Sequence, residues 1–392
     1  MSAWAEAPIA IVGGGQLGRL LAMAARTLGW GVRVLDPDPL CPARGVVDRL
    51  ITAPLDDVDA AVELARGAAV VTLDIESVGI PALEAAARHA PVRPRPAVLA
   101  VVQDREAQKG WLVRRGYPVG PHRVVRDTPA LDAALQELGP SFVKRCRGGY
   151  DGRGQARVRV PADRPAARSL LAGAASAAVV EQALDLEAEL SVLVARSTRG
   201  EIAVYPPALN QHEAGVLAWS LLPATLPAPV LTEACEIARA IAVDLEVEGL
   251  LTVELFVLPG GRLLVNELAP RPHNTFHATE IACATSQFEQ GVRAILGLPL
   301  GSVELVRPAA LGNLLGDRWI GGPPPFARAL QVPGVRLHLY EKREARPGRK
   351  MGHLLASGAT SDEALARVEA ALRGLDTRDG DPRGSAGEAT FV

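Results

Sequence analysis

Residues 250–269 read LLTVELFVLPGGRLLVNELA, two apolar runs on either side of a Pro-Gly-Gly sequence. The runs predict two antiparallel strands, and the two glycines at 260–261 predict a two-residue hairpin turn between them. In that register Glu254 lies directly opposite Glu267, on the same face of the sheet. The rest of the chain therefore has to accommodate an acidic pair among apolar neighbours.

The two glutamates predict a metal site. Like charges that face each other on a half-buried sheet cost free energy unless something neutralises them. Their carboxylate oxygens suit Mg²⁺, or Mn²⁺ in its place, and Asn266 joins the cluster if the strand twists or bulges. The alternatives are a solvated sheet edge, or a three-residue turn that places Glu254 and Glu267 on opposite faces.

A second unusual stretch lies upstream, where residues 144–154 read KRCRGGYDGRG. Its four glycines supply flexible backbone donors, and its four basic side chains supply positive charge. This combination suits a mobile flap over a polyphosphate, although it is not the G-x-x-x-x-G-K-[ST] phosphate-binding loop. A solvated basic hairpin turn is the alternative.

The N-terminal region contains a third glycine-rich turn, GGGQLG at residues 13–18. It follows an apolar strand at 8–12 and opens a helix at 16–28, and Asp36 ends the next strand. This arrangement fits the dinucleotide-binding fingerprint. Its helix N-terminus would equally attract a phosphorylated substrate, and a purely structural tight turn is also consistent with the pattern.

Strands and helices alternate through residues 8–75, which predicts a parallel sheet with helices on both faces. The Pro-rich stretch at 91–98 is interpreted as a linker or domain edge. His273 and His277 are expected to be hydrogen-bonded histidines beside a site rather than a metal pair.

Composition excludes several classes of protein. The 392 residues are 48% hydrophobic and 22% charged, which predicts several globular domains rather than wholesale disorder. Lys plus Arg (42) nearly balance Asp plus Glu (44), so no global attraction to nucleic acid or anionic membrane is expected. Four cysteines without C-x-x-C, a non-basic N-terminus and the lack of a long apolar run indicate a reduced, cytoplasmic protein without a membrane span. No H-E-x-x-H or G-x-S-x-G motif supports a zinc enzyme or a serine hydrolase.

Taken together, the motifs resemble one family. In chain order they are GGGQLG (13–18), QDR-x₃-K (103–109), GGYDGRGQ (148–155), EQ (181–182), VNELAPRPHN (265–274), SQFEQ (286–290) and GRKMGH (348–353). This series is similar to the N5-carboxyaminoimidazole ribonucleotide synthetases, ATP-grasp carboxylating enzymes of purine biosynthesis. The resemblance spans roughly residues 8–358.

The resemblance implies an α/β fold of the ATP-grasp type in three domains. It implies a Rossmann-like N-terminal parallel-sheet domain at 1–102 and a small α+β lid domain at 103–183. A larger C-terminal α+β domain at 184–392 would carry the magnesium site and a small terminal subdomain. It also implies a homodimer.

The implied reaction joins bicarbonate to the exocyclic amine of 5-aminoimidazole ribonucleotide at the expense of ATP. Bicarbonate would attack the γ-phosphate to give carboxyphosphate, which then carboxylates the amine, directly or through released CO₂. Phosphoryl transfer of this kind needs metal, cationic groups and exclusion of water more than a covalent nucleophile.

Site residues carry over from the matching motifs. Substrate or carboxyphosphate contacts with a catalytic role are expected from Tyr150, Asp151, Arg153 and Arg271. The expected metal ligands are Glu254 and Glu267. Nucleotide contacts are expected from Arg105, Lys144, Gly148, Gly149, Tyr150, Asp151, Gly152, Arg153, Gly154, Glu181, Gln182, Ala183, Leu184, Glu189, His212, Asn266 and Glu267. The ribonucleotide is expected at Gly15, Gln16, Leu17, Glu76, Lys342, Arg349 and Lys350.

Two segments depart from the family pattern. The usual EFENV is DIESV at residues 74–78, which retains Glu76. The usual HNSGHWT is HNTFHAT at residues 273–279, so that Phe276 replaces a glycine and Ala278 a tryptophan. These changes bear on local packing and on contacts between subunits.

Two other functions are consistent with parts of the sequence. An NAD(P)-dependent oxidoreductase would explain the turn at 13–18 and Asp36, but not the basic flap or the acidic hairpin. A non-catalytic ATP-binding regulator on the same fold would explain the motifs, but it would have no need for intact Lys144, Glu254 and Glu267.

Overall fold

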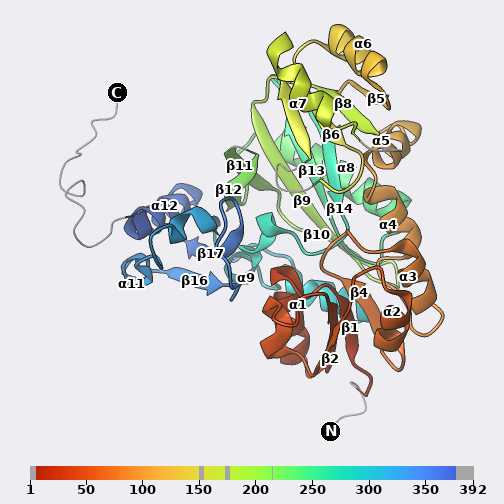
Figure 1. The fold of residues 1–392 in the computed structure, drawn as a ribbon. Helices are drawn as coiled ribbons and strands as arrows, with labels where there is room; N and C mark the ends of the chain where they lie inside the picture. Colours follow the sequence, from red (N-terminus) through yellow and green to blue (C-terminus); the bar gives the residue numbers. More distant parts are fainter. Residues whose placement is uncertain (1–5, 150–153, 173–176, 214, 377–392) are drawn as a thin grey trace.

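Three β-sheets organise the chain in the computed structural model, which describes residues 6–149, 154–172, 177–213 and 215–376. A small sheet formed by the N-terminal region and a small sheet formed by residues 122–182 lie at opposite ends of the molecule, with the largest sheet between them (Figure 1). No helix in the described ranges combines the length and the apolar character that crossing a bilayer requires.

The N-terminal sheet is parallel, in the order β3-β2-β1-β4. Its strands are β1 (Ile9–Val12), β2 (Val32–Asp36), β3 (Arg49–Thr52) and β4 (Val70–Leu73), and its helices are α1 (Gln16–Thr27), α2 (Val58–Ala65), α3 (Ile80–Ala86) and α4 (Pro96–Val102). Every residue of β1 and β4 is buried, because α1 covers one face while α2 and α3 cover the other. The predicted parallel sheet is confirmed, and β3 is an additional edge strand.

The interpretation of residues 91–98 as a linker was wrong. Val92 forms a parallel bridge with Val71 and so extends the sheet, and α4 begins at Pro96. Proline is favoured in the first turn of a helix, where its missing N–H leaves no hydrogen bond unmade. Pro96 therefore begins a helix, while the residues before it pair with the sheet.

The second sheet is antiparallel, in the order β5-β8-β6-β7. Its strands are β5 (His122–Val125), β6 (Ser141–Arg145), β7 (Gln155–Val158) and β8 (Ala178–Gln182); the nearby helices are α5 (Arg105–Arg114), α6 (Thr128–Leu138) and α7 (Arg164–Ser169). Leu131 and Leu135 of α6 pack against Val143 and Val180. We call this unit the lid, since residues 144–154 belong to it.

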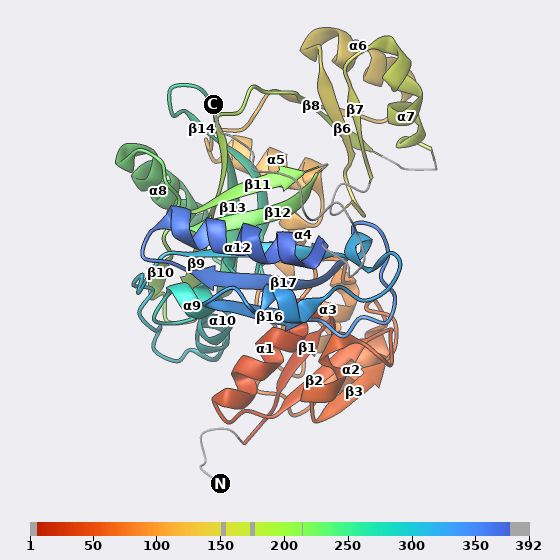
Figure 2. The same cartoon turned by 90° about the vertical axis from the view of Figure 1, so that its left-hand side faces the viewer.

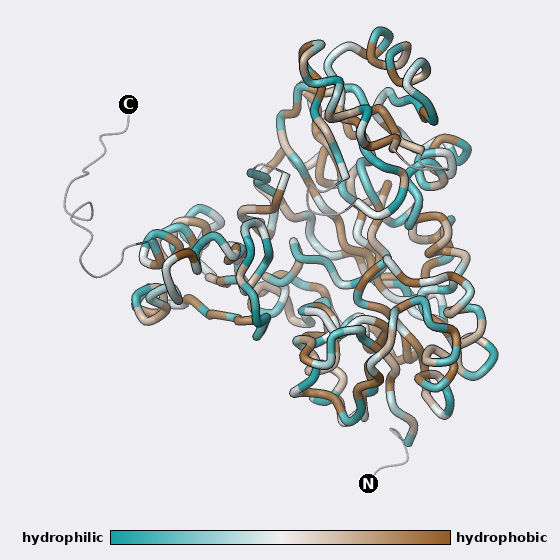
Figure 3. The backbone as a smooth tube through the Cα atoms, in the orientation of Figure 1, coloured by the Kyte–Doolittle hydropathy of each residue, from teal (hydrophilic) through white to brown (hydrophobic). Residues whose placement is uncertain are grey.

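The central sheet has nine strands, in the order β14-β13-β9-β11-β12-β15-β17-β16, with β10 paired to β9. The strands are β9 (Ala188–Arg196), β10 (Ile202–Val204), β11 (Ala208–Glu213), β12 (Val216–Leu222), β13 (Gly249–Val257), β14 (Leu263–Ala269), β15 (Ala309–Leu315), β16 (Val335–Leu339) and β17 (Lys350–Ser357). The associated helices are α8 (Ala228–Asp244), α9 (Thr279–Ala282), α10 (Gln287–Leu296), α11 (Phe326–Ala329) and α12 (Ser361–Asp376). Figure 2 shows α12 lying along β17, and Figure 3 shows hydrophobic segments within the strands of the sheets.

The hairpin of β13 and β14 combines a wrong prediction with a confirmed one. The Leu258 N–H donates to the Arg262 carbonyl (2.9 Å), so the loop has three residues rather than two. A β-bulge at Asn266 then adds one residue to β14 and restores the pairing of Glu254 with Glu267. The two glutamates therefore face each other, although the turn is not the one that the sequence predicts.

The two departures at 276 and 278 lie in one apolar cluster. Phe276 and Ala278 are both fully buried in the described structure, beside Leu193 and Tyr205. The Phe276 ring lies 6.4 Å from the Tyr205 ring at an interplanar angle of 57°. The large ring at 276 and the small side chain at 278 therefore fill the same region of the core.

Replacing Phe276 by alanine is expected to lower the free energy of unfolding by about 3–5 kcal/mol, because it empties a fully buried ring site. Urea unfolding followed by circular dichroism measures this loss. The matched control is Val306→Ala at a 60% exposed position, which should change stability by no more than about 0.5 kcal/mol. Equal losses in the two variants would contradict the packing role of Phe276.

Candidate active site

Two lysines and a glutamate mark the lid side of the site. Lys144 Nζ on β6 donates to Glu181 Oε2 on β8 (2.6 Å), and Lys109 Nζ on α5 lies 3.4 Å from Glu181 Oε1. Burial alone would raise the pKa of Glu181, but the charges of the two lysines and the hydrogen bond from Lys144 lower it to about 2. Glu181 is therefore a buried, ionised acid held between two ammonium groups.

The acidic pair marks the hairpin side. His273 Nε2 lies 3.2 Å from Glu254 Oε1, and Asn266 Nδ2 donates to Glu254 Oε2 (3.3 Å). Burial raises the pKa of the Glu254 carboxyl, but the hydrogen bond and charge of His273 and the charges of His212 and Arg271 outweigh it and lower the pKa to about 2. Arg105 Nη1 at the start of α5 lies 2.9 Å from Glu267 Oε2.

This donor set fits a hard divalent cation. Two carboxylates on adjacent strands and a neighbouring amide converge on one face of the hairpin, and hard oxygen ligands of this kind suit Mg²⁺. The cations that now surround the carboxylates come from side chains outside the hairpin, which shows that the pair requires positive charge.

A histidine and a glutamate lie on the neighbouring strands. Glu189 on β9 pairs with Asn210 on β11, which places His212 on the same face two residues further along. His212 Nδ1 is 3.1 Å from Glu189 Oε2. Burial would lower the pKa of His212, but its hydrogen bond to Glu189 and the charge of that carboxylate raise it.

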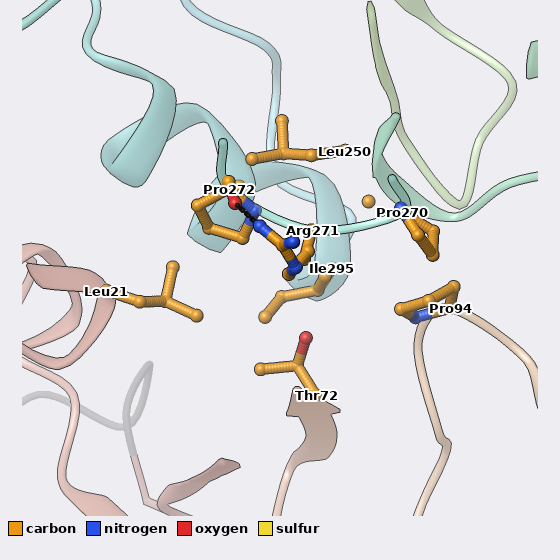
Figure 4. Close-up of a pocket in the computed structure, with 10 residues that line it drawn as sticks. Leu21, Thr72, Pro94, Leu250, Pro270, Arg271, Pro272 and Ile295 are labelled. Carbon is orange, nitrogen blue, oxygen red and sulfur yellow. Dashed lines mark hydrogen bonds between the residues drawn. The ribbon is translucent and has the colours of Figure 1, made fainter. Parts of the chain in front are cut away.

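Arg271 follows β14 and faces the N-terminal sheet. Its Nε lies 2.8 Å from Glu76 Oε1, and its Nη1 donates to the Pro272 carbonyl (2.9 Å). Figure 4 shows Arg271 beside a small cavity lined mainly by apolar residues, among them Leu21 and Leu250. Its volume of about 10 Å³ is at the lower limit for one water molecule, so this cavity is not a nucleotide site.

The N-terminal turn binds two carboxylates of its own chain. The Gly14 N–H donates to Asp36 Oδ2 (2.6 Å), and the Gly18 N–H at the start of α1 donates to Asp74 Oδ2 (3.0 Å). At Gly13 the backbone φ is +96°, and an added Cβ would lie 1.7 Å from Asp74 Oδ1. In a dinucleotide site the helix N-terminus binds a pyrophosphate and the acid at the end of the second strand binds a ribose. Here both are engaged within the chain, which disfavours the oxidoreductase interpretation.

The expected ribonucleotide contacts fall into two groups. Gly15 and Gln16 lie at the start of α1, whereas the Leu17 side chain is buried in the core and leaves only its backbone for a ligand. Lys342 Nζ donates to the Lys350 carbonyl (2.7 Å), and Arg349 Nη1 donates to the Glu344 carbonyl (3.0 Å). These residues connect β16 to β17.

The flap is described only in part. Gly148 and Gly154 have positive φ angles of 76° and 70°, and the Gly154 carbonyl accepts from the Arg145 N–H (2.9 Å). Gly149 lies between them, and Gln182, Ala183 and Leu184 lead out of β8. The expected residues Tyr150, Asp151, Gly152 and Arg153 lie outside the described ranges.

Comparison with known proteins agrees with this arrangement. Residues 7–103 match the ribonucleotide synthetase preATP-grasp domain, 111–288 the ATP-grasp domain and 309–367 the phosphoribosylaminoimidazole carboxylase C-terminal domain. The N5-carboxyaminoimidazole ribonucleotide synthase of Bacillus subtilis is 38% identical over 365 residues, covering 92% of this chain and 94% of that protein. The protein of the same name from Brucella melitensis is 41% identical over 347 residues, covering 88% and 95%.

The chain belongs to the N5-carboxyaminoimidazole ribonucleotide synthase family. Solved structures of the family agree with the fold. The Aspergillus clavatus synthase complexed with ATP is 32% identical, with a TM-score of 0.88 over 95% of this chain and 99% of that one. The structure of the same fungal synthase with ADP and 5-aminoimidazole ribonucleotide has a TM-score of 0.86 at 31% identity, with the same coverage. The predicted family and its ATP-grasp α/β fold are confirmed.

Three residues of this family member were given no role by the sequence. Lys109 belongs to the QDR-x₃-K motif, but only the structure places it beside Glu181. His273 was expected to be hydrogen-bonded near a site, and its contact with Glu254 specifies which site. Asp74 follows β4, which lies beside β1 in the sheet, and this adjacency brings its carboxylate to the Gly18 N–H of α1.

Asp74→Asn is expected to change how stability depends on pH. Burial raises the pKa of Asp74 to about 7, so the folded protein retains a proton that an unfolded aspartate releases near pH 3.9. The contribution of Asp74 to the stability of the wild type should therefore fall as pH rises from about 4 to 7, by up to about 1.4 kcal/mol per pH unit. Asparagine cannot titrate, so the difference in unfolding free energy should move in favour of the variant between pH 5 and pH 8.

Urea unfolding at pH 5, 6, 7 and 8 measures this shift. Asp59→Asn, at an exposed position in the first turn of α2, is the control and should keep the pH profile of the wild type. Parallel profiles for Asp74→Asn and the wild type would refute the assignment of a retained proton.

Proposed function

We propose that this protein is an ATP-dependent ligase that carboxylates 5-aminoimidazole ribonucleotide to N5-carboxyaminoimidazole ribonucleotide. Family membership supports the reaction, and the relatives and structures named above carry that activity or those ligands. The observation that carries the proposal is the pairing of Glu254 with Glu267, next to Lys109, which contacts both the Asn266 carbonyl and Glu181 of the lid.

We assign the nucleotide to the space between hairpin and lid. Glu254, Glu267 and Asn266 would hold Mg²⁺, or Mn²⁺ in its place, which when bound neutralises charge on the transferred phosphoryl group. Lys144, Arg105 and the glycine loop at 148–154 would contact the ATP phosphates. Residues 181–184 would contact the base, and Glu189 with His212 the ribose.

We assign the ribonucleotide to the junction with the N-terminal sheet. The proposed contacts are Gly15, Gln16, Leu17 through its backbone, Glu76, Lys342, Arg349 and Lys350, with Tyr150, Asp151, Arg153 and Arg271 at the reacting groups. Arginine and lysine suit a phosphate monoester and a doubly charged carboxyphosphate. Bicarbonate as second substrate, a homodimer and a cytoplasmic location are further parts of the proposal, drawn from the resemblance.

The other two candidate functions have less support. The Gly14 and Gly18 amides are engaged by Asp36 and Asp74, and Asp36 is the acid that would bind the ribose of a dinucleotide, which argues against a nicotinamide cofactor there. A silent ATP-binding regulator would have no reason to keep two like charges opposed on adjacent strands, since that arrangement costs stability.

Phosphate release is the direct test. In the wild type it should require ATP, bicarbonate and 5-aminoimidazole ribonucleotide together. Glu267→Gln should lower it by about 10²–10³-fold, because one charged group at the transferred phosphoryl is lost while the fold persists. The exposed Glu304→Gln serves as the matched control and should retain full turnover.

The two parts of the proposal fail in different ways. Normal turnover by a correctly folded Glu267→Gln variant would remove the metal assignment. Release that ignores the ribonucleotide would refute the reaction itself.

Arg349→Ala is expected to raise KM for the ribonucleotide by about 10-fold or more, because a charge-assisted contact to phosphate contributes about 1.5–3 kcal/mol. KM for ATP should change by less than about twofold. Steady-state phosphate release with each substrate varied in turn measures both constants, with Arg336→Ala, an exposed residue of β16, as the control. Equal changes in the two constants would place Arg349 outside the substrate site.

A further inference from the structure

Three side chains on one face of α5 contact β14 at its bulge. Arg105, Gln108 and Lys109 are spaced i, i+3 and i+4, so they project from one side of the helix. Arg105 contacts Glu267 Oε2 (2.9 Å), Gln108 Oε1 accepts from the Leu268 N–H (3.2 Å), and Lys109 Nζ donates to the Asn266 carbonyl (3.0 Å). We call these three residues the α5 clamp.

The clamp occupies an open sheet edge. Because β14 is the outermost strand of the central sheet, its outward backbone groups have no neighbouring strand. The Val265 N–H donates to the Pro118 carbonyl (2.7 Å), and the clamp takes the next two groups, the Asn266 carbonyl and the Leu268 N–H. Residues 108–118 therefore supply hydrogen-bond partners for the outer edge of β14, which a neighbouring strand would otherwise supply.

The bulge decides which residue faces Glu254. Near the loop Leu255 pairs with Val265, and an unbroken ladder would next pair Glu254 with Asn266 and turn Glu267 to the other face. The extra residue returns Glu267 to the side of Glu254 while Asn266 still reaches it. A bulge disrupts the ladder, and opposed carboxylates repel, so this register needs support from outside the hairpin.

Lys109 is the member of the clamp suited to give that support. Its side chain is 6% exposed, compared with 14% for Lys144, which shares Glu181 with it. A buried ammonium group is costly unless it is paired and hydrogen-bonded. Its two partners are the carbonyl of the bulged residue and the carboxylate of the lid strand β8.

We propose that Lys109 is a positioning residue that fixes the Asn266 bulge, keeps Glu267 beside Glu254 and links this pair to the lid through Glu181. The inference deepens the proposed function, since it rests on the metal site assigned to the two glutamates. It differs from a direct role in nucleotide binding, which the same test distinguishes.

The test measures Mn²⁺ and ADP binding to the whole protein. Mn²⁺ is titrated into a mixture in which the protein is in twofold excess over ADP, and the electron paramagnetic resonance signal reports the concentration of free Mn²⁺. The affinity for ADP without metal is measured separately, by calorimetry in a buffer that contains a metal chelator. Lys109→Met, which keeps length and removes charge, should weaken Mn²⁺ binding about 10–100-fold, as expected for loss of a group that orients metal ligands. ADP affinity without metal should change by less than about threefold.

Two further variants isolate the cause. Gln108→Met removes the Leu268 contact without touching a charge, and it should weaken Mn²⁺ binding in the same direction but less. Gln290→Met is the matched control. The side chain of this buried glutamine of α10 donates to the Gly301 carbonyl and accepts from the Gly301 N–H. Loss of these two hydrogen bonds should lower stability without changing Mn²⁺ affinity.

Each result has one meaning. Unchanged Mn²⁺ affinity in folded Lys109→Met overturns the proposal, and if that variant does not fold, unchanged affinity in Gln108→Met does so. An equal loss of metal-free ADP affinity would instead make Lys109 a nucleotide ligand and also overturn it. A wild type that binds ADP but no Mn²⁺ would refute the underlying metal site.

Discussion

Two negative charges opposed on neighbouring strands are the constraint around which this molecule is built. Glu254 and Glu267 are half-buried beside apolar residues of the same two strands, with 23% and 40% of their side chains exposed, so their repulsion is only partly screened by water. Basic or polar side chains contact these carboxylates: Arg105 at the start of α5, His273 in the segment after β14, and Asn266 at the bulge. The two strands of the hairpin supply no positive charge near this pair, so the basic side chains beside it come from other parts of the chain.

The same electrostatic logic repeats at the two borders of the site. Glu181 is ionised between Lys109 and Lys144 where the lid meets the central sheet. Glu76 pairs with Arg271 where the N-terminal sheet meets it. A mostly buried ion pair thus lies at each border, and loss of one partner would leave a buried charge without its partner. These ion pairs connect the three sheets, and their charges also face the site.

Sequence alone was sufficient where the signal is local. The glycine turn at 13–18, the strands on either side of it and the acidic hairpin follow from apolar periodicity and turn residues. The sequence left open whether the turn has two or three residues and whether the strand bulges, because the contacts at the bulge come from α5 and Pro118, more than a hundred residues away. The prolines at 91–98 predicted a linker or domain edge, because the bridge of Val92 to Val71 and the packing of α4 leave no local signal in the sequence. The partner of Asp74 required knowledge of which strands are adjacent, and that is a property of topology rather than of spacing.

The exchange of bulk between positions 276 and 278 has an evolutionary consequence. Both side chains are fully buried in the apolar cluster that contains Tyr205, so a large ring at each position would add volume to a packed core, and a small side chain at each would remove it. Either single exchange therefore changes the volume packed into this cluster. Chimaeras within this family should therefore inherit the segment 273–279 whole, together with the aromatic residue against which it packs.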